Sequence, residues 1–371
     1  MSASETIRAR DLGIPFDGQP GQWNAITDVS GVTVGFHTLV GESESGAAIR
    51  TGVTAVLPLG RDTVSEKVHA AVFSLNGNGE LTGSHWIEEG GTMEGPVMIT
   101  NTHSVGVVRD AVIAWQVKNG VPQGHEHWWS MPVVGETYDG WLNDINGFHV
   151  RPEHVFEALE TATSGRVAEG NVGGGTGMIA HQFKGGTGTS SRVVEIDGQA
   201  YTVGVLVQAN YGSRDELRIA GVPVGRHLTE NRAYEQASEE GGSDDSGSII
   251  IVAATDAPLM PHQLKRLIRR GAMGLARMGS YAGNGSGDIF LAFSTANAVA
   301  SEAETRTVTV LGNEQLNPLF LATVRATEEA IVNAMVAART MTGLDGHRAV
   351  AIDHQALQGV LRQYGRLEAT P

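Results

Sequence analysis

The sequence predicts an α/β protein in which buried strands alternate with helices. Short β-branched runs bounded by turn residues recur along the chain, the clearest of them at residues 249–255, and such runs are typical of buried strands. Apolar residues at helical spacing follow several of these runs, as at 261–278 and 318–340. The 49 glycines lie inside these patterned segments, which indicates many tight turns and close backbone approaches.

Composition narrows the class of protein. At 371 residues and 41% hydrophobic content, the chain can bury a sizeable core, as two or more domains or as one large α/β unit. A formal charge of -15 argues against nucleic-acid binding, which needs a basic face. The absence of cysteine removes disulfides and thiolate zinc sites. The start has no apolar secretory region and no stretch is long enough for a membrane span, so we expect a soluble, cytoplasmic protein that does not contact a membrane.

The N-terminal half reads as strands and turns with two helices. The patterns predict strands at 32–35, 53–57, 70–75 and 97–100 and helices at 107–118 and 152–167. The strand at 70–75 leads into a polar, glycine-rich turn at 76–81, which is typical of a site loop and equally of a plain hairpin.

Two segments superficially suggest a metal or a nucleotide. Residues 125–127 hold two histidines at i, i+2 without a third ligand, which is more typical of a surface loop than of a metal site. Residues 173–177 are glycine-rich, but they follow a helix and no Gly-Lys-Ser/Thr comes after them, so they predict a tight turn with close backbone packing. We therefore expect neither a metal nor a cofactor.

A loop at 132–144 gathers several carboxylates, a phenol and an indole directly after a buried strand, with Glu136, Tyr138 and Trp141 as its leading members. It is equally compatible with an acidic, aromatic substrate pocket and with a capping turn followed by amphipathic sequence.

The C-terminal half contains three further candidate side chains. A hairpin at 191–208 turns at residues 197–198 and ends near Asn210, whose amide is either a donor into a site or a turn former. Ser286 and Asp288 precede a strand at 289–293; two apart on extended backbone, they point the same way, as a proton relay needs, although Gly-Ser-Gly-Asp is also an ordinary turn. We further predict a strand at 307–311, a buried helix at 318–340, a last strand at 349–352 and a closing helix at 355–364.

The peptide bond between Gly247 and Ser248 separates a polar linker at 239–246 from the buried strand. Cleavage there would leave Ser248 with a free α-amine, whose ordinary pKa of about 7.7–8.0 lets it act as a base beside its own hydroxyl. Glycine at position 247 permits the close approach of hydroxyl to carbonyl that such cleavage needs. The competing interpretation is a linker that simply meets a strand.

These segments together resemble the L-aminopeptidase/D-amidase-esterase family, which includes the β-peptidyl aminopeptidases. The resemblance runs from residues 8–14 almost to the C-terminus and is most specific at 132–144, 203–212, 247–258 and 283–294. It implies an N-terminal-nucleophile-like αββα sandwich, with two central mixed sheets between helices, and a single catalytic unit over 1–371. It also implies self-cleavage into an α chain, 1–247, and a β chain, 248–371, which assemble as tetramers of αβ units.

The resemblance assigns roles as follows. Ser248 is the nucleophile, Gly247 the new end of the α chain, and Ser286 and Asp288 polarise the Ser248 amine and hydroxyl; some relatives carry Glu at the position of Asp288. Asn210 donates into the oxyanion hole, where one donor is worth about 3–4 kcal/mol. Glu136 holds the substrate ammonium, and it lines the substrate pocket with Tyr138 and Trp141.

The expected function is therefore an aminopeptidase that releases N-terminal residues from short peptides, amides or esters through an acyl-enzyme on Ser248. D-amino acid amides or esters and β-peptides are possible substrates. One alternative is an acyltransferase of the ornithine-acetyltransferase type, although those enzymes use threonine where this chain has Ser248. Another is an uncleaved, inactive scaffold or binding protein.

Overall fold

Two mixed β-sheets form the centre of the molecule. The computed structural model describes residues 6–61, 66–119, 128–234, 247–299, 305 and 307–367. The linker at 239–246 and the two histidines of 125–127 lie outside the described residues.

The smaller sheet has four strands in the order β1-β2-β5-β6. These strands are β1 (Thr33–Glu42), β2 (Ala48–Leu57), β5 (Val97–Asn101) and β6 (Val133–Thr137). The larger sheet has six, in the order β4-β3-β12-β11-β10-β9. They are β4 (Thr92–Glu94), β3 (Lys67–Gly77), β12 (Ser286–Val299), β11 (Gly247–Thr255), β10 (Gln199–Asn210) and β9 (Gly186–Ile196). Only β5–β6 and β11–β12 run parallel among these neighbours, so both sheets are mixed.

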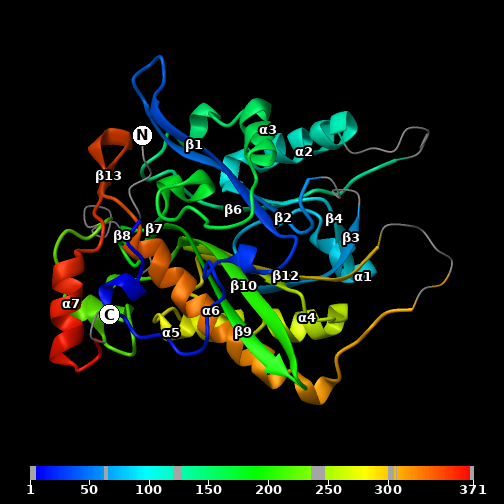
Figure 1. Cartoon of the computed structure of the whole chain (residues 1–371). Helices are drawn as coiled ribbons and strands as arrows, with labels where there is room; N and C mark the ends of the chain where they lie inside the picture. The colour runs from blue at the N-terminus through cyan, green and yellow to red at the C-terminus, as the bar shows by residue number, and fades with distance from the viewer. Residues whose placement is uncertain are drawn as a thin grey trace.

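Helices cover the outer face of each sheet (Figure 1). The smaller sheet packs against α2 (Val105–Asn119) and α3 (Pro152–Glu160). The larger sheet packs against α4 (Pro261–Ile268), α5 (Gly271–Arg277) and α6 (Asn317–Val336). Besides short 3-10 helices, the remaining described elements are α1 (Ser84–Gly90), α7 (His354–Gln363) and two short strand pairs, β7 (Ile179–Ala180) with β8 (Phe183–Lys184) and β13 (Met341–Thr342) with β14 (Arg348–Ala349). None of the helices in the described ranges is long and apolar enough to cross a membrane.

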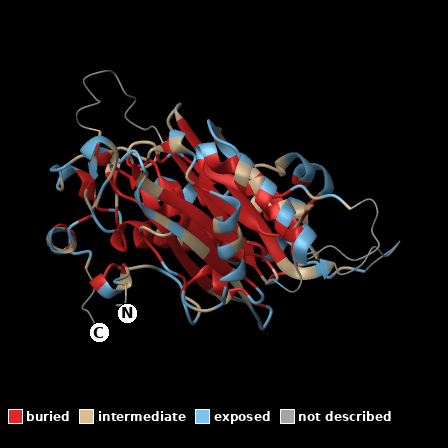
Figure 2. Cartoon of the chain, turned by 90° about the horizontal axis from the view of Figure 1, so that it is seen from above, coloured by how far each residue is buried: buried red, intermediate tan, exposed pale blue. Residues whose placement is uncertain are grey.

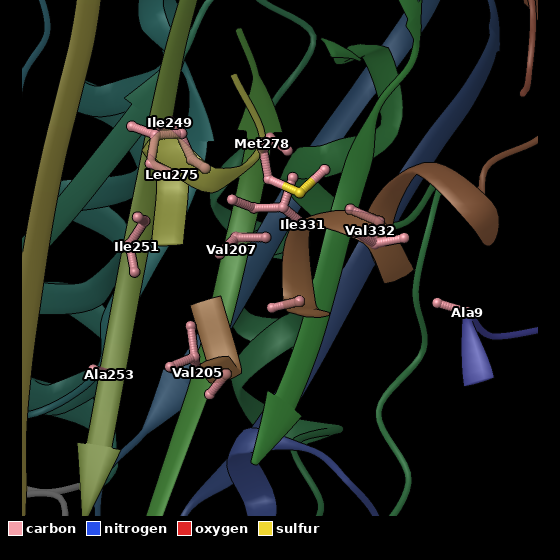
Figure 3. Packing of buried hydrophobic residues seen from close by; sticks show 14 of the residues in the cluster. Ala9, Val205, Val207, Ile249, Ile251, Ala253, Leu275, Met278, Ile331 and Val332 are labelled. Atoms are coloured by element: carbon pink, nitrogen blue, oxygen red, sulfur yellow. The ribbon is translucent and has the colours of Figure 1, made fainter. Parts of the chain in front are cut away.

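The alternation of side chains in β11 shows why the layers stack in this order. Ile249, Ile251 and Ala253 belong to the cluster between the larger sheet and its helices, and Figure 3 shows Ile249 beside Leu275. The intervening residues 250, 252 and 254 belong to the cluster between the two sheets. A strand buried on both faces needs a continuous apolar run, and β11 has one. Buried residues accordingly fill the strands of both sheets in Figure 2, and the predicted αββα sandwich is confirmed.

The hairpin of β9 and β10 is also confirmed, with Ile196 paired to Gln199 across a two-residue turn. Asp197 and Gly198 both have positive φ, 51° and 78°, as the tight turn of a twisted hairpin requires.

Two of the predicted strands were wrong: one is absent and the other is shorter than predicted. Residues 307–311 form no strand, because the Asn297 side chain bonds both the N–H and the C=O of Thr309 at 3.0 and 2.9 Å and takes the place of a neighbouring strand. The predicted strand at 349–352 shrinks to Arg348–Ala349, since the carbonyl of Val350 accepts instead from the Lys184 backbone.

Two of the predicted helices were also wrong. The helix predicted at 152–167 ends at Glu160, after which Thr163 exchanges backbone hydrogen bonds of 3.0 Å with Val34 of β1. The single helix predicted at 261–278 is two helices, and the break lets α5 cross α6 closely. A Cβ on Gly274 would lie only 2.6 Å from Cβ of Thr327.

A buried ion cluster ties the N-terminal segment to the larger sheet and α6. Glu329 on α6 accepts hydrogen bonds from Arg10 at 2.7 and 2.9 Å, from Arg192 of β9 at 2.6 Å and from Asn24 at 2.6 Å. Burial would raise the pKa of Glu329, but the two guanidinium groups hold it below its usual value. The carboxylate therefore stays charged inside the protein.

We predict that Glu329→Gln lowers the free energy of unfolding by about 3–5 kcal/mol, because it leaves Arg192 buried without its anion. The control is Glu88→Gln, which breaks the exposed pair of Glu88 with Lys265 and should cost less than about 1 kcal/mol. Urea-induced unfolding of both variants measures the difference, and equal losses would contradict the role of the cluster.

Candidate active site

Ser248 is the second residue of β11 and lies in the middle of the larger sheet. It pairs with Asn210 of antiparallel β10 on one side and with Gly287 of parallel β12 on the other. Because side chains alternate along β11, Ser248 points with Ile250 toward the space between the sheets. Only 5% of Ser248 is exposed, and its Oγ donates to the carbonyl oxygen of Gly247 at 2.7 Å. The hydroxyl thus lies against the carbonyl that precedes it.

Only glycine fits the position before Ser248. Gly247 has φ of +148°, a conformation that other residues rarely adopt. A Cβ there would lie 2.2 Å from the carbonyl oxygen of Asn210 and 2.8 Å from Cα of Tyr211. The absent side chain allows β10 to approach the Gly247–Ser248 bond directly.

Asn210 is held by hydrogen bonds at both ends of its amide. Its Nδ2 donates to the carbonyl of Tyr138 at 2.9 Å, and its Oδ1 accepts from the N–H of Ile179 at 2.8 Å. These two partners fix which end is the nitrogen. A primary amide nitrogen has two N–H groups, so a second donor remains on the side chain opposite Ser248.

Ser286 and Asp288 form the hydroxyl–carboxylate pair that their spacing predicts. The Oγ of Ser286 donates to Oδ1 of Asp288 at 2.7 Å, and both side chains are buried. They flank Gly287, the residue aligned with Ser248, but alternation places them on the helix-covered face with Phe290. The pair therefore lies on the opposite face of the larger sheet from the Ser248 hydroxyl.

Glu136 ends β6 as a buried carboxylate, only 4% exposed. Oε1 accepts from the N–H of Glu80 at 3.0 Å and Oε2 from the hydroxyl of Thr102. Burial raises the pKa of Glu136, although these hydrogen bonds act in the opposite direction. A Cβ on Gly79 would lie 3.2 Å from Oε1 of Glu136 and 3.3 Å from Cα of Gly287, so Gly79 touches both. The carboxylate is thereby brought close to the residue beside Ser248.

The two aromatic residues of the loop differ in position. Tyr138 is 52% exposed, and its carbonyl holds Asn210 at the site. Trp141 stacks on His347, with ring centroids 3.7 Å apart, and contacts Tyr234 at 4.7 Å. Its ring contacts thus join it to a neighbouring cluster, whereas Tyr138 faces solvent next to Asn210.

The side chain of Asp139 joins this loop to the smaller sheet by hydrogen bonds. Its buried carboxylate accepts from Nδ2 of Asn101 at 3.0 and 3.2 Å and from Nδ2 of Asn143 at 3.1 Å. Burial raises the pKa of Asp139 to about 6, against hydrogen bonds from Thr51, Asn101 and Asn143 that lower it. Asp139 is a structural anchor, because its oxygens are committed to these amides.

Several groups around the site were not predicted from the sequence. The hydroxyl of Thr102 and the backbone N–H of Glu80, which hold Glu136, lie in polar turns that follow strands, and that position was the available signal. Lys184 was missed as well. It is fully buried, and its Nζ donates to three backbone carbonyls. A lone lysine in the glycine-rich stretch 183–188 was the only hint.

The glycine-rich segment at 173–177 is a buried 3-10 turn, η5 (Gly173–Gly177), wedged between the two sheets. A Cβ on Gly174 would lie 2.2 Å from Oε1 of Gln208 and one on Gly175 would lie 2.3 Å from the N–H of Thr187. The expected close backbone packing is confirmed. In the described part of the chain, no group of three or more His, Asp and Glu side chains is placed to hold a metal ion.

Comparisons with known proteins bear on the family and the fold of the chain. The profile of peptidase family S58 matches residues 24–349. The chain is 53% identical to a β-peptidyl aminopeptidase, BapA, of Sphingosinicella microcystinivorans over 99% of this chain and 95% of that protein. The solved L-aminopeptidase D-Ala-esterase/amidase of Ochrobactrum anthropi has a TM-score of 0.92 and 52% identity, covering 97% and 99% of the two chains. A β-aminopeptidase from a Burkholderia species has a TM-score of 0.89 and 48% identity, covering 97% of this chain and 99% of that one.

The fold and these likenesses define an N-terminal-nucleophile hydrolase, a serine aminopeptidase. The chain belongs to peptidase family S58. The resemblance inferred from the sequence is confirmed, and the acyltransferase and scaffold alternatives are not favoured.

We predict that Asp139→Asn gains stability relative to the wild type as pH rises. The pKa of Asp139 is about 6 in the fold against 3.8 for the ordinary group, so the folded state binds this proton more tightly than the unfolded state does. The wild type therefore loses stability as pH rises from about 4 to about 6, whereas the Asn variant, which has no such proton, does not. The difference of about two units corresponds to about 3 kcal/mol, and any cost of the mismatched amide is the same at both pH values. Urea unfolding near pH 4 and pH 7 measures the change. Exposed Asp110→Asn is the control, and a pH-independent difference for Asp139→Asn would contradict the prediction.

Proposed function

We propose that this aminopeptidase cleaves its own Gly247–Ser248 bond and then uses Ser248 as an N-terminal nucleophile. The observation that carries the proposal is the 2.7 Å hydrogen bond between Oγ of Ser248 and the carbonyl of Gly247, at a position where only glycine fits. Oγ attacks the carbonyl carbon of Gly247, and the C–N bond breaks as the nitrogen takes up a proton. Water then hydrolyses the resulting ester, which frees the Gly247 carboxylate and restores the Ser248 hydroxyl beside its new amine.

The sheet explains why the two chains would remain together. Residues 1–247 supply β3, β4, β9 and β10. Residues 248–371 supply the two central strands, that is, β11 except for Gly247 and the whole of β12. Each chain therefore pairs with the other along both β10–β11 and β3–β12. Cleavage removes one covalent bond and leaves these ladders intact.

In catalysis, the free amine of Ser248 accepts the proton of its own hydroxyl as Oγ attacks the substrate carbonyl. The second N–H of Asn210 stabilises the developing oxyanion, and Ser286 with Asp288 orients and polarises the amine. The protonated amine then donates to the leaving amine, ammonia or alcohol. Water then attacks the acyl-enzyme ester in the same way, with the Ser248 amine as base, and releases the N-terminal residue.

Substrate selection depends on Glu136, the buried carboxylate near Gly287. A free ammonium of a short peptide, amide or ester satisfies this charge, whereas an acylated amine leaves it unpaired. Exposed Tyr138 borders the pocket, and Trp141 supports the loop through its stack on His347. The names of the relatives, β-peptidyl aminopeptidase and D-Ala-esterase/amidase, support acceptance of β-peptides and of D-amino acid amides or esters.

The family resemblance also supports an assembly of four αβ units. The cysteine-free composition is compatible with the cytoplasmic location expected from the sequence.

We predict that purified wild-type protein contains chains of 247 and 124 residues that co-purify, whereas Ser248→Ala stays at 371 residues, folded and inactive. Gly247→Ala should also stay largely uncut, because its Cβ would overlap the carbonyl of Asn210. Intact mass spectrometry measures the species. Ser246→Ala is the control and should be cut normally; active wild type found only at full length would refute self-cleavage.

We predict that Glu136→Gln loses selectivity for a free amine. Wild type should prefer a dipeptide amide to its N-acetylated form by about tenfold or more in kcat/KM, since an unpaired buried charge costs roughly 1–3 kcal/mol or more. The variant should self-cleave yet lose most of that preference. Exposed Glu80→Gln, a neighbouring carboxylate whose backbone N–H still reaches Glu136, is the control and should keep it. Equal hydrolysis of both substrates by the wild type would overturn the aminopeptidase assignment.

A further inference from the structure

Lys184 is a fully buried basic side chain that no carboxylate contacts in the described part of the chain. Its Nζ donates to the carbonyls of Met178 at 2.7 Å, Gly185 at 2.9 Å and Gly175 at 3.4 Å. Burial lowers the pKa of Lys184 to about 7. A neutral amine has only two N–H donors, so three surrounding carbonyls favour the ammonium form.

One of these carbonyls leads directly to Asn210. Met178 C=O and Ile179 N–H belong to the same peptide group. That N–H donates to Oδ1 of Asn210 at 2.8 Å, and the other end of the Asn210 amide carries the donor proposed for the oxyanion. The path thus runs from ammonium to peptide to side-chain amide without a gap. Hydrogen bonds linked in this way polarise one another, more strongly where water is excluded.

The hydrogen bonding of the Met178 carbonyl does not by itself require a lysine here. The carbonyl of Met178 also accepts from the N–H of Gly185 at 2.9 Å, so it has a partner without Lys184. The segment is held by packing as well, because a Cβ on Gly185 would lie 2.4 Å from the carbonyl of Ala209. An apolar side chain would avoid the desolvation cost of a buried ion. What lysine adds is charge, on the β10 side of Ser248.

We propose that Lys184 is a positioning residue for the oxyanion hole, which orients and polarises the Asn210 amide through the Met178–Ile179 peptide group. The inference rests on the proposed role of Asn210. The negative charge that forms on the substrate carbonyl oxygen in the transition state is the counterpart of the unpaired ammonium. Lys184 therefore stabilises the transition state more than the bound substrate.

The test uses Lys184→Met, which keeps the length of the side chain without charge or donors, and Lys184→Gln, which keeps a donor without charge. Both are assayed as the processed two-chain enzyme, with the second chain co-expressed from Ser248 if self-cleavage is slow. We expect kcat to fall about tenfold or more in both variants, with KM changed less than about twofold. Binding of an aminoalkyl boronic acid, whose adduct with Ser248 is a tetrahedral anion, should weaken in parallel with kcat.

The decisive measurement is the double-mutant cycle with Asn210→Ala. If Lys184 acts through Asn210, Lys184→Met should change kcat less than about twofold once the amide is gone. Additive losses would overturn the relay and leave the role of Asn210 intact. Full kcat in Asn210→Ala alone would overturn the oxyanion assignment and the relay together.

A purely structural role gives a different pattern. Recovery of kcat in Lys184→Gln would refute the inference. So would a fall in kcat and in boronate affinity that is accompanied by a similar rise in KM and by lower stability in urea. If Lys184→Met does not fold, Lys184→Gln carries the cycle in its place. An inactive wild type would be a failure of the proposed function and is seen before any variant is made.

Discussion

The position of Ser248 between an antiparallel and a parallel neighbour is the constraint on which the site depends. From β10 the antiparallel pairing delivers Asn210 directly opposite Ser248, and from β12 the parallel pairing delivers Gly287 with Ser286 and Asp288 on either side. A single register therefore sets the donor, the nucleophile and the hydroxyl–carboxylate pair. A slip of one residue would turn each side chain to the other face of the sheet. The buried, β-branched residues that follow Ser248 fix that register, so the hydrophobic core and the chemistry have the same cause.

Glycine residues allow the strands and loops that carry the site to approach one another closely. Gly247 admits β10 to the bond before Ser248, and Gly287 admits the loop after β3, since its Cβ would lie 2.3 Å from the carbonyl of Asn78. Gly79 in that loop touches Glu136 and Gly287 together. The many glycines of this sequence thus serve close backbone contact around one point, and side chains at these three positions would push apart the strands and loops that carry the site.

The sequence predicted what depends on local pattern and missed what depends on distant contacts. The strand at 249–255, the hairpin at 197–198 and the Ser286–Asp288 pair follow from alternation and turn chemistry, so they were accessible. The break between α4 and α5 depends on α6, and the end of α3 depends on β1, neither of which a local window contains. Glu329 meets Arg10 across 319 positions, and Lys184 reaches Asn210 through a peptide group. Trp141 could be seen to lie near Tyr138 in the chain, but only the fold shows that its ring stacks on His347.

Two buried charges of opposite sign lie on either side of Ser248. On the β12 side, Gly79 lies next to both Glu136 and Gly287. On the β10 side, Lys184 is linked to Asn210 through the peptide group of Met178 and Ile179. Under the roles proposed above, a substrate whose ammonium met the carboxylate would direct its scissile carbonyl oxygen toward the Asn210 amide that the lysine polarises. Both groups are carried by packed elements, so the fold sets their positions, whereas Tyr138, two residues after Glu136, is exposed.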